Sequence, residues 1–142
     1  MTTHEQAPPS RDQERVVNEF RAQGGNVGGY HATMDLLLLT TTGARTGQRR
    51  AVPLTYLPDG DRYIVTAGNA GRDRHPAWYH NLAANPDVTV EVGSEAFPAV
   101  ADIADEAERP ALYARFAAAY PQAGDYQERT SRPIPVVILS RR

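Results

Sequence analysis

The apolar residues of this chain gather in short runs separated by glycine, proline and polar residues, a pattern typical of strands. Residues 36–39 are four leucines in a row, which predicts a strand covered on both faces. Residues 88–92 alternate apolar and polar side chains, as a strand with one buried face does. Further strands are predicted over residues 51–57, 62–67, 96–103 and 134–139. The chain is therefore expected to be mainly β.

Helical spacing of apolar residues is found in three other segments. In the first, residues 11–22, the side chains of Val16, Val17 and Phe20 share one face, and Ser10 can serve as the N-cap. The other two predicted helices cover residues 76–84 and 105–120, and residues 121–133 are expected to form a polar loop.

The predicted order is helix, three strands, helix, two strands, helix and strand. Pro58 and Gly60 mark a tight turn and hence a hairpin. Strands and helices do not alternate regularly, which favours an antiparallel barrel with flanking helices, an α+β and mainly β fold, over a doubly wound sheet. The 142 residues suffice for one domain, expected over residues 11–142 after a mobile tail at residues 1–10.

All fifteen basic residues are arginine. Without lysine the chain cannot form a Schiff base or supply a P-loop lysine, which excludes pyridoxal phosphate chemistry and ordinary Walker-type nucleotide hydrolysis. It has no cysteine, and no metal site is expected. The net charge of −2 does not indicate the excess of positive charge that is typical of nucleic-acid-binding proteins. Neither a membrane-spanning run nor a signal peptide is found, so a cytoplasmic protein is expected.

The leucine strand leads into a turn that carries three arginines. Gly43 and Gly47 bracket this turn, so its backbone can come close to a ligand. Arg45, Arg49 and Arg50 lie within six residues of one another. A rigid strand that presents fixed cations at a turn is suited to binding an anion. Our hypothesis is that this turn binds the phosphate-bearing tail of a cofactor.

Two other features leave alternatives open. The glycine-rich residues 24–29 can form either a linker or a flap over a ligand. Arg72 and Arg74 can either form a second rim of the cationic site or lie on ordinary solvated surface.

Three sequence blocks together resemble the deazaflavin (F420)-dependent nitroreductase family, a branch of the split-barrel flavin reductases. The blocks cover residues 36–54 (LLLLTTTGARTGQRRAVPL), 75–92 (HPAWYHNLAANPDVTVEV) and 120–139 (YPQAGDYQERTSRPIPVVIL). The resemblance implies a six-stranded antiparallel split β-barrel and hydride transfer from reduced F420.

The resemblance also implies roles for individual residues. Arg45 and Arg50 match basic residues that contact the cofactor phosphate, and Asn81 matches a further polar contact. Tyr126 matches a tyrosine near the reacting face, where a phenol could donate a proton, and it is the candidate catalytic residue. The full set of expected cofactor-binding residues is Arg45, Thr46, Gly47, Arg50, Ala67, Gly68, Asn69, Gly71, Arg74, Trp78 and Asn81.

The function implied is that of an F420H2-dependent oxidoreductase acting on a small electron-poor acceptor, such as a quinone, nitroaromatic or enone. One alternative is an F420-binding carrier without efficient turnover, and another is an FMN- or heme-binding split-barrel protein. The expected partner is a small-molecule acceptor and not a nucleic acid, and the expected assembly is a monomer or homodimer. Peripheral contact with the inner face of the membrane is an alternative location to the bulk cytoplasm, without stable insertion.

Overall fold

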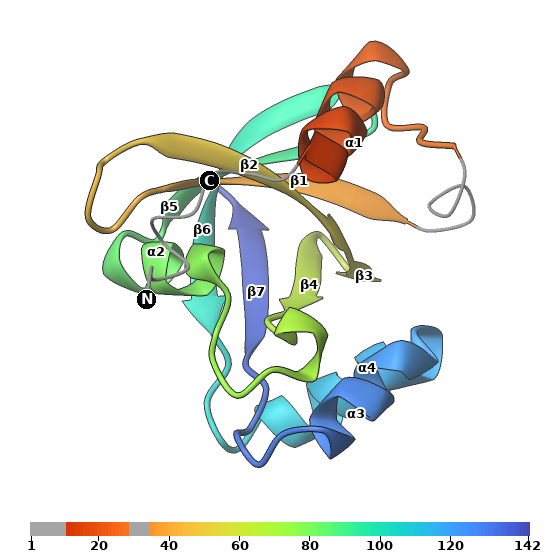
Figure 1. Cartoon of the computed structure of the whole chain (residues 1–142), viewed down its shortest axis with the longest axis vertical. Coiled ribbons are helices and arrows are strands. Elements are labelled where there is room, and N and C mark those ends of the chain that lie inside the picture. Colours follow the sequence, from red (N-terminus) through yellow and green to blue (C-terminus); the bar gives the residue numbers. More distant parts are fainter. Residues whose placement is uncertain (1–10, 29–34) are drawn as a thin grey trace.

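The computed structural model describes residues 11–28 and 35–142 (Figure 1). The predicted tail at residues 1–10 and the last residue of the glycine-rich segment 24–29 lie outside the described residues. The helices are α1 (Arg11–Ala22), α2 (Ala77–Ala84), α3 (Arg109–Ala119), α4 (Pro121–Glu128) and the short 3₁₀ helix η3 (Asn69–Gly71). The strands are β1 (Leu36–Thr42), β2 (Arg49–Thr55), β3 (Leu57–Asp59), β4 (Arg62–Thr66), β5 (Asp87–Val92), β6 (Glu95–Ile103) and β7 (Val136–Arg141).

The described strands form a seven-stranded sheet in the order β2-β1-β5-β6-β7-β4-β3, and every neighbouring pair is antiparallel. The two edge strands, β2 and β3, are separated along the chain by Tyr56 alone. Because the two edges are joined there, the sheet must curl, and it forms a half-barrel (Figure 1). The predicted antiparallel, mainly β fold is confirmed.

The predicted count of six strands is wrong, because the strand expected over residues 51–57 breaks at Tyr56. Its first part pairs with β1 from Leu36 to Thr42, and its last part pairs with β4 across the turn at Gly60. The Tyr56 N–H donates to the carbonyl of Asp35, 3.2 Å away, where β1 begins. The single predicted strand is therefore two strands, β2 and β3, which pair with β1 and β4 and form opposite edges of the sheet.

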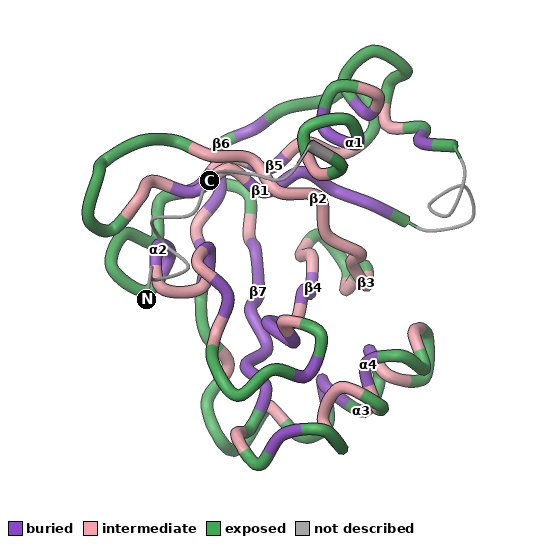
Figure 2. Tube along the Cα trace, in the orientation of Figure 1, coloured by how far each residue is buried: buried purple, intermediate pink, exposed green. Residues whose placement is uncertain are grey.

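The leucine strand β1 is buried on both faces, as its composition predicts. Leu37 and Leu39 pack inside the half-barrel, whereas Leu36 and Leu38 pack against α1. Buried residues follow β1 and β7 through the middle of the sheet (Figure 2). This rigid strand supports the turn that follows it.

Helix α1 has the predicted bounds and covers one face of the sheet. Val16, Val17 and Phe20 are buried against β1, so the apolar face of this helix is occupied within the protein. Among the described residues, no helix is both long and apolar enough to cross a bilayer.

The prediction of a polar loop over residues 121–133 is wrong, because its first part is helix α4. Pro121 ends α3 and suits the first turn of the next helix, so α4 begins immediately. On α4 only Ala123 is buried, the half-buried positions include Tyr126 and Gln127, and apart from Pro121 the exposed positions are polar. Such a short and weakly apolar helix has little periodic signal. Helix α3 also starts later than expected, at Arg109, after a turn closed by Asp105.

Candidate functional site

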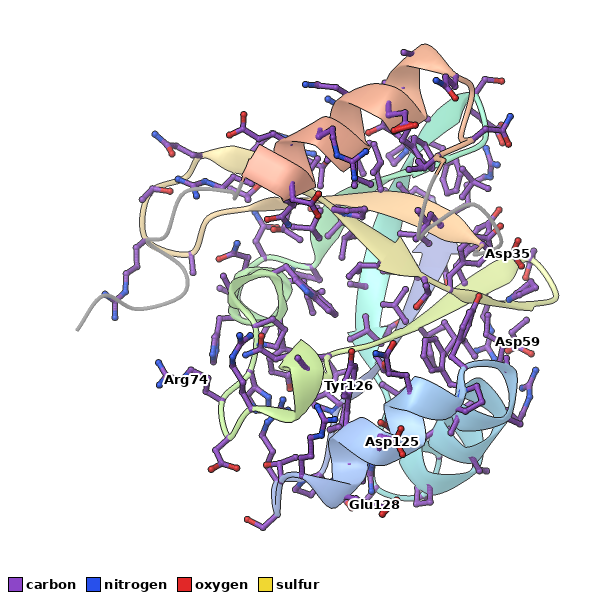
Figure 3. The ribbon with its side chains drawn as sticks, turned by 45° about the vertical axis from the view of Figure 1, so that its right-hand side comes forward. Asp35, Asp59, Arg74, Asp125, Tyr126 and Glu128 are labelled. Carbon is purple, nitrogen blue, oxygen red and sulfur yellow. The ribbon has the colours of Figure 1, made fainter. Side chains whose placement is uncertain are left out.

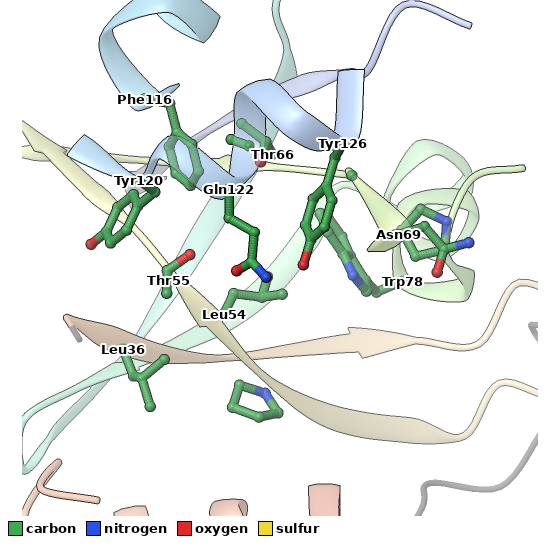
Figure 4. A pocket seen from close by; sticks show the side chains of 14 residues that line it. Leu36, Leu54, Thr55, Thr66, Asn69, Trp78, Phe116, Tyr120, Gln122 and Tyr126 are labelled. Carbon is green, nitrogen blue, oxygen red and sulfur yellow. The ribbon is translucent and has the colours of Figure 1, made fainter. Parts of the chain in front are cut away.

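A cavity of about 350 Å³ opens where the edge of the sheet meets α2 and the junction between α3 and α4 (Figure 4). Its walls come from segments far apart in the sequence. They are formed by Leu36, Pro53, Leu54, Thr55, Thr66, Gly68, Asn69, Pro76, Trp78, Phe116, Tyr120, Gln122, Ala123 and Tyr126. Mostly apolar walls with a few convergent polar groups are typical of a small-molecule site.

Two polar side chains from α4 reach into this cavity. The Tyr126 hydroxyl and the Gln122 amide both point into it and lie near each other (Figure 4). Tyr120, at the start of α4, instead donates its hydroxyl to the carbonyl of Tyr56 at 2.8 Å. Tyr126 therefore presents its phenol to the cavity, whereas the phenol of Tyr120 serves to join α4 to the edge of the sheet.

The Tyr120 phenol gives a testable dependence of stability on pH. Burial, followed by the effects of Asp35 and Tyr56, raises the pKa of Tyr120 to about 12. The unfolded value is about 10, so the folded protein holds this proton more tightly. The resulting stabilisation is complete below pH ~10 and is lost as the pH rises towards about 12.

Urea unfolding of wild type and Tyr120→Phe across this alkaline range checks this dependence. The free energy of unfolding should fall more steeply with pH in wild type than in the variant. Equal slopes would mean that the phenol of Tyr120 is not held in this environment.

The loop before α2 forms the wall beside Tyr126, and two of its glycines pack closely against α4 and the residue that follows it. A Cβ added at Gly68 would lie 3.1 Å from the Tyr126 ring, and one at Gly71 would lie 2.9 Å from Cβ of Arg129. The Asn69 amide donates to the carbonyl of Arg74 at 2.9 Å. The loop is thus fitted against α4.

The turn after β1 is held by its own backbone. The Gly43 N–H donates to the carbonyl of Gln48 at 2.7 Å, and the Gly47 N–H donates to the carbonyl of Gly43 at 2.9 Å. Gly47 has a φ of 71°, which favours glycine. Arg45 and Thr46 are exposed at the tip. The backbone that carries Arg45 is therefore held in one conformation by these hydrogen bonds.

Arg49 and Arg50 lie on opposite faces of β2. Arg49 donates to the hydroxyls of Thr42 at 3.0 Å and Thr89 at 2.7 Å. Arg50 stands opposite Thr41 in the strand register, so its side chain leaves the sheet on the same face as Thr41. The predicted trio of arginines is thus divided, and only Arg45 and Arg50 remain candidates for one anion site.

Asn81 connects the turn to α2. It is only 5% exposed, its Oδ1 accepts the Ala44 N–H at 3.0 Å, and its Nδ2 donates to Thr41 Oγ1 at 3.1 Å. These bonds fix the arginine turn relative to α2. Direct contact between Asn81 and a cofactor stays a prediction.

The structure divides the predicted cofactor-binding residues into two groups. Gly68, Asn69 and Trp78 line the cavity together with Tyr126. The turn residues Arg45, Thr46 and Gly47 do not line the cavity. Their turn is connected to it through α2, because Asn81 of α2 binds the Ala44 N–H.

Three further predicted residues, Ala67, Gly71 and Arg74, belong to the same loop as Gly68 and Asn69. Ala67 is buried behind it, and Gly71 lies against α4. The exposed Arg74 side chain extends outward from the segment before α2 (Figure 3). Contact of any of the predicted residues with a cofactor stays a prediction.

Sequence reasoning missed Gln122 and Arg132. Gln122 follows Pro121, and a helix–proline–helix junction beside Tyr120 could have indicated it. Arg132 lies in the segment between α4 and β7, and its guanidinium contacts backbone carbonyls of the loop before α2. Backbone acceptors carry no side-chain identity, so no motif in the sequence points to this contact.

A curled antiparallel sheet with an apolar cavity at its opening, and an arginine-bearing turn beside it, defines a small β protein of the split-barrel, redox-cofactor-binding class. Residues 12–141 match the F420H(2)-dependent quinone reductase family, and the chain belongs to that family. The resemblance drawn from the three sequence blocks is therefore confirmed.

Individual relatives agree with this assignment. An F420H(2)-dependent quinone reductase of Mycobacterium tuberculosis strain H37Rv is 47% identical over 111 residues, which are 75% of this chain and 73% of the relative. The solved F420-H2 dependent reductase FDR-A is 37% identical, with a TM-score of 0.69 over 75% of this chain and 94% of that chain. A solved structure described as a domain-swapped dimer is 34% identical, with a TM-score of 0.71 over 92% of this chain and 96% of that chain.

Proposed function

We propose that this protein is an F420H2-dependent oxidoreductase that reduces quinones. The observation that carries the proposal is the spacing along α2. Pro76 and Trp78 line the cavity, and Asn81 fixes the arginine turn three residues further along the helix. A helical rise of about 4.5 Å thus separates Trp78, in the wall of an apolar chamber for a planar ring, from Asn81, which holds the turn that offers cations to an acidic tail.

The residues present fit such a ligand. F420 joins a flat deazaflavin to a phosphodiester and a tail of glutamates. Arg45 and Arg50 offer guanidinium groups, which bind phosphate strongly and directionally. Trp78 and Leu54 offer apolar surface to the ring, and Gly68 leaves room for close approach to its backbone.

The chemistry requires alignment more than acid–base machinery. Reduced deazaflavin supplies a hydride when bound. The apolar walls around Leu54 and Trp78 limit the access of water, and the chamber holds the acceptor beside the ring. We assign to the Tyr126 hydroxyl the transfer of a proton to an acceptor oxygen, and solvent replaces that proton. One hydride, which carries both electrons, and one proton together would convert the quinone into a hydroquinone, and the hydride donor would be left in its oxidised form.

The proposal is tested by titrating purified protein with F420 and with FMN, then following oxidation of F420H2 with the quinone menadione. F420 should bind, and menadione should be reduced with turnover. Tight FMN binding without F420 binding would contradict the assignment. Binding of F420 without turnover across quinones, nitroaromatics and enones would instead support the carrier alternative.

The proposal treats residues 11–142 as one cofactor-binding domain and a small molecule as its partner. The relative described as a domain-swapped dimer favours a homodimer for this chain as well. Light scattering during size-exclusion chromatography distinguishes the dimer from a monomer of 15.6 kDa.

A further inference from the structure

We propose that Arg132 is a positioning residue, which holds the loop of residues 67–75 in the conformation that lines the cavity. The inference rests on the proposed function, because it assigns Arg132 an effect on hydride transfer through that loop. Arg132 itself is not among the residues that line the cavity.

The loop needs external support because its backbone is unfavourable. Asn69, Ala70 and Gly71 have φ values of 48°, 55° and 78°, so three consecutive residues are left-handed. Glycine adopts this region freely and asparagine tolerates it, but alanine does not. Ala70 is exposed, so no packing of its side chain offsets the strain.

A single guanidinium spans this left-handed turn. Nη2 of Arg132 donates to the carbonyls of Ala67 at 3.2 Å and Gly68 at 2.9 Å, before the turn. Its Nε donates to the carbonyl of Arg72 at 2.9 Å, after the turn. Only a planar fork of donors can reach both ends at once, so lysine cannot replace arginine here.

The third guanidinium nitrogen of Arg132, Nη1, contacts the segment just before α2. Nη1 lies 3.1 Å from Nδ1 of His75, which must accept in this pair. Burial, and then the charges of Arg132 and His80, lower the pKa of His75, which keeps its ring neutral and able to accept. The guanidinium thus holds the loop from Ala67 to His75.

The position of this loop matters to the chemistry because Gly68 and Asn69 form a wall of the cavity. Gly68 also packs against the Tyr126 ring. A shift of the wall would misplace a bound ring relative to its acceptor, and misplacement by about 1 Å can lower a rate by about a hundredfold. The cations of the arginine turn lie elsewhere and would still bind the tail.

The first variant is Arg132→Lys, and Arg109→Lys is its matched control. Arg109 is also partly buried and also donates to a backbone carbonyl, that of Ile134 at 3.2 Å, but it lies outside the cavity loop. The first readout is hydrogen–deuterium exchange of residues 67–75 in protein without ligand. Exchange should rise about tenfold or more in Arg132→Lys and remain unchanged in Arg109→Lys.

The second readout is the single-turnover rate of hydride transfer from F420H2 to menadione. Arg132→Lys should lower this rate about ten- to a hundredfold while the Kd of F420 changes less than about threefold. Adding Ala70→Gly to Arg132→Lys should restore part of both the rate and the exchange protection, because glycine removes the strain that the guanidinium opposes. Faster exchange confined to residues 67–75 distinguishes this local effect from a general loss of stability, which would speed exchange throughout the protein.

Several results would overturn the proposal. They are unchanged exchange in Arg132→Lys, an unchanged rate despite faster exchange, an equal loss of rate in Arg109→Lys, or failure of Ala70→Gly to rescue. If Arg132→Lys does not fold, Ala70→Val tests the loop with Arg132 intact, since a β-branched residue disfavours the left-handed turn. An unchanged rate in Ala70→Val would then reject the inference. Failure of wild type to bind F420 would reject the proposed function, whereas the exchange result in ligand-free protein would still report on Arg132.

Discussion

Arg50→Ala is expected to weaken the binding of F420 by about 1.5–3 kcal/mol, which is roughly a ten- to hundredfold rise in Kd. The proposed function assigns to Arg50 a charge-assisted hydrogen bond to the anionic part of the cofactor, and the substitution removes that bond. Arg50 leaves β2 on the face that also carries Thr41, whose hydroxyl is bound by Asn81 of α2. Fluorescence titration with F420 measures the change directly.

Arg49→Ala provides a matched control one residue away. The Arg49 guanidinium is bound to Thr42 and Thr89 on the opposite face of the sheet. Its removal takes away the same formal charge at nearly the same position in the chain, so it controls for long-range electrostatics. The Kd should change less than about threefold. Equal losses in both variants would show that net charge, and not a contact of Arg50, determines affinity.

This pair of arginines shows what the sequence could predict about the site. The glycine turn and its cations were evident from residue types alone. Alternation along β2 indicates only that Arg49 and Arg50 lie on opposite faces of the strand. Which of them lies on the face towards α2 depends on the register of β2 against β1. The pairing of Arg50 with Thr41 resolves the direction, because Thr41 is bound to Asn81.

The fold was predictable where local pattern and tertiary environment agree. The leucine run of β1 and the amphipathic face of α1 were both correctly identified, because each is buried as its composition requires. The break at Tyr56 was not predictable, since it depends on where two partner strands end. Helix α4 was missed because it buries so little that its apolar periodicity is weak. Tyr126 was nonetheless identified as a candidate from its place in the family pattern.

Tyr126→Phe is expected to lower quinone turnover by about tenfold or more and to leave the Kd of F420 within about twofold. A positioned proton donor typically contributes a hundredfold or more to a rate, and the lower bound allows solvent to replace it in part. The substitution isolates the hydroxyl because the ring is held by other contacts. It lies against Gly68, and the Arg129 guanidinium carbon lies 5.8 Å from its centroid. Phenylalanine should therefore occupy the same position.

Tyr56→Phe is the control for removing a phenol near the cavity. The Tyr56 ring packs edge-on against Tyr63, with centroids 5.4 Å apart, and its side chain is not part of the cavity wall. Steady-state kinetics with menadione should give wild-type turnover for this variant and reduced turnover for Tyr126→Phe. If both variants kept the wild-type rate, the proton would come from solvent or from another donor. The Gln122 amide is too weak an acid to supply that proton, so its role would be to orient the acceptor. Tyr126 would then only line the cavity.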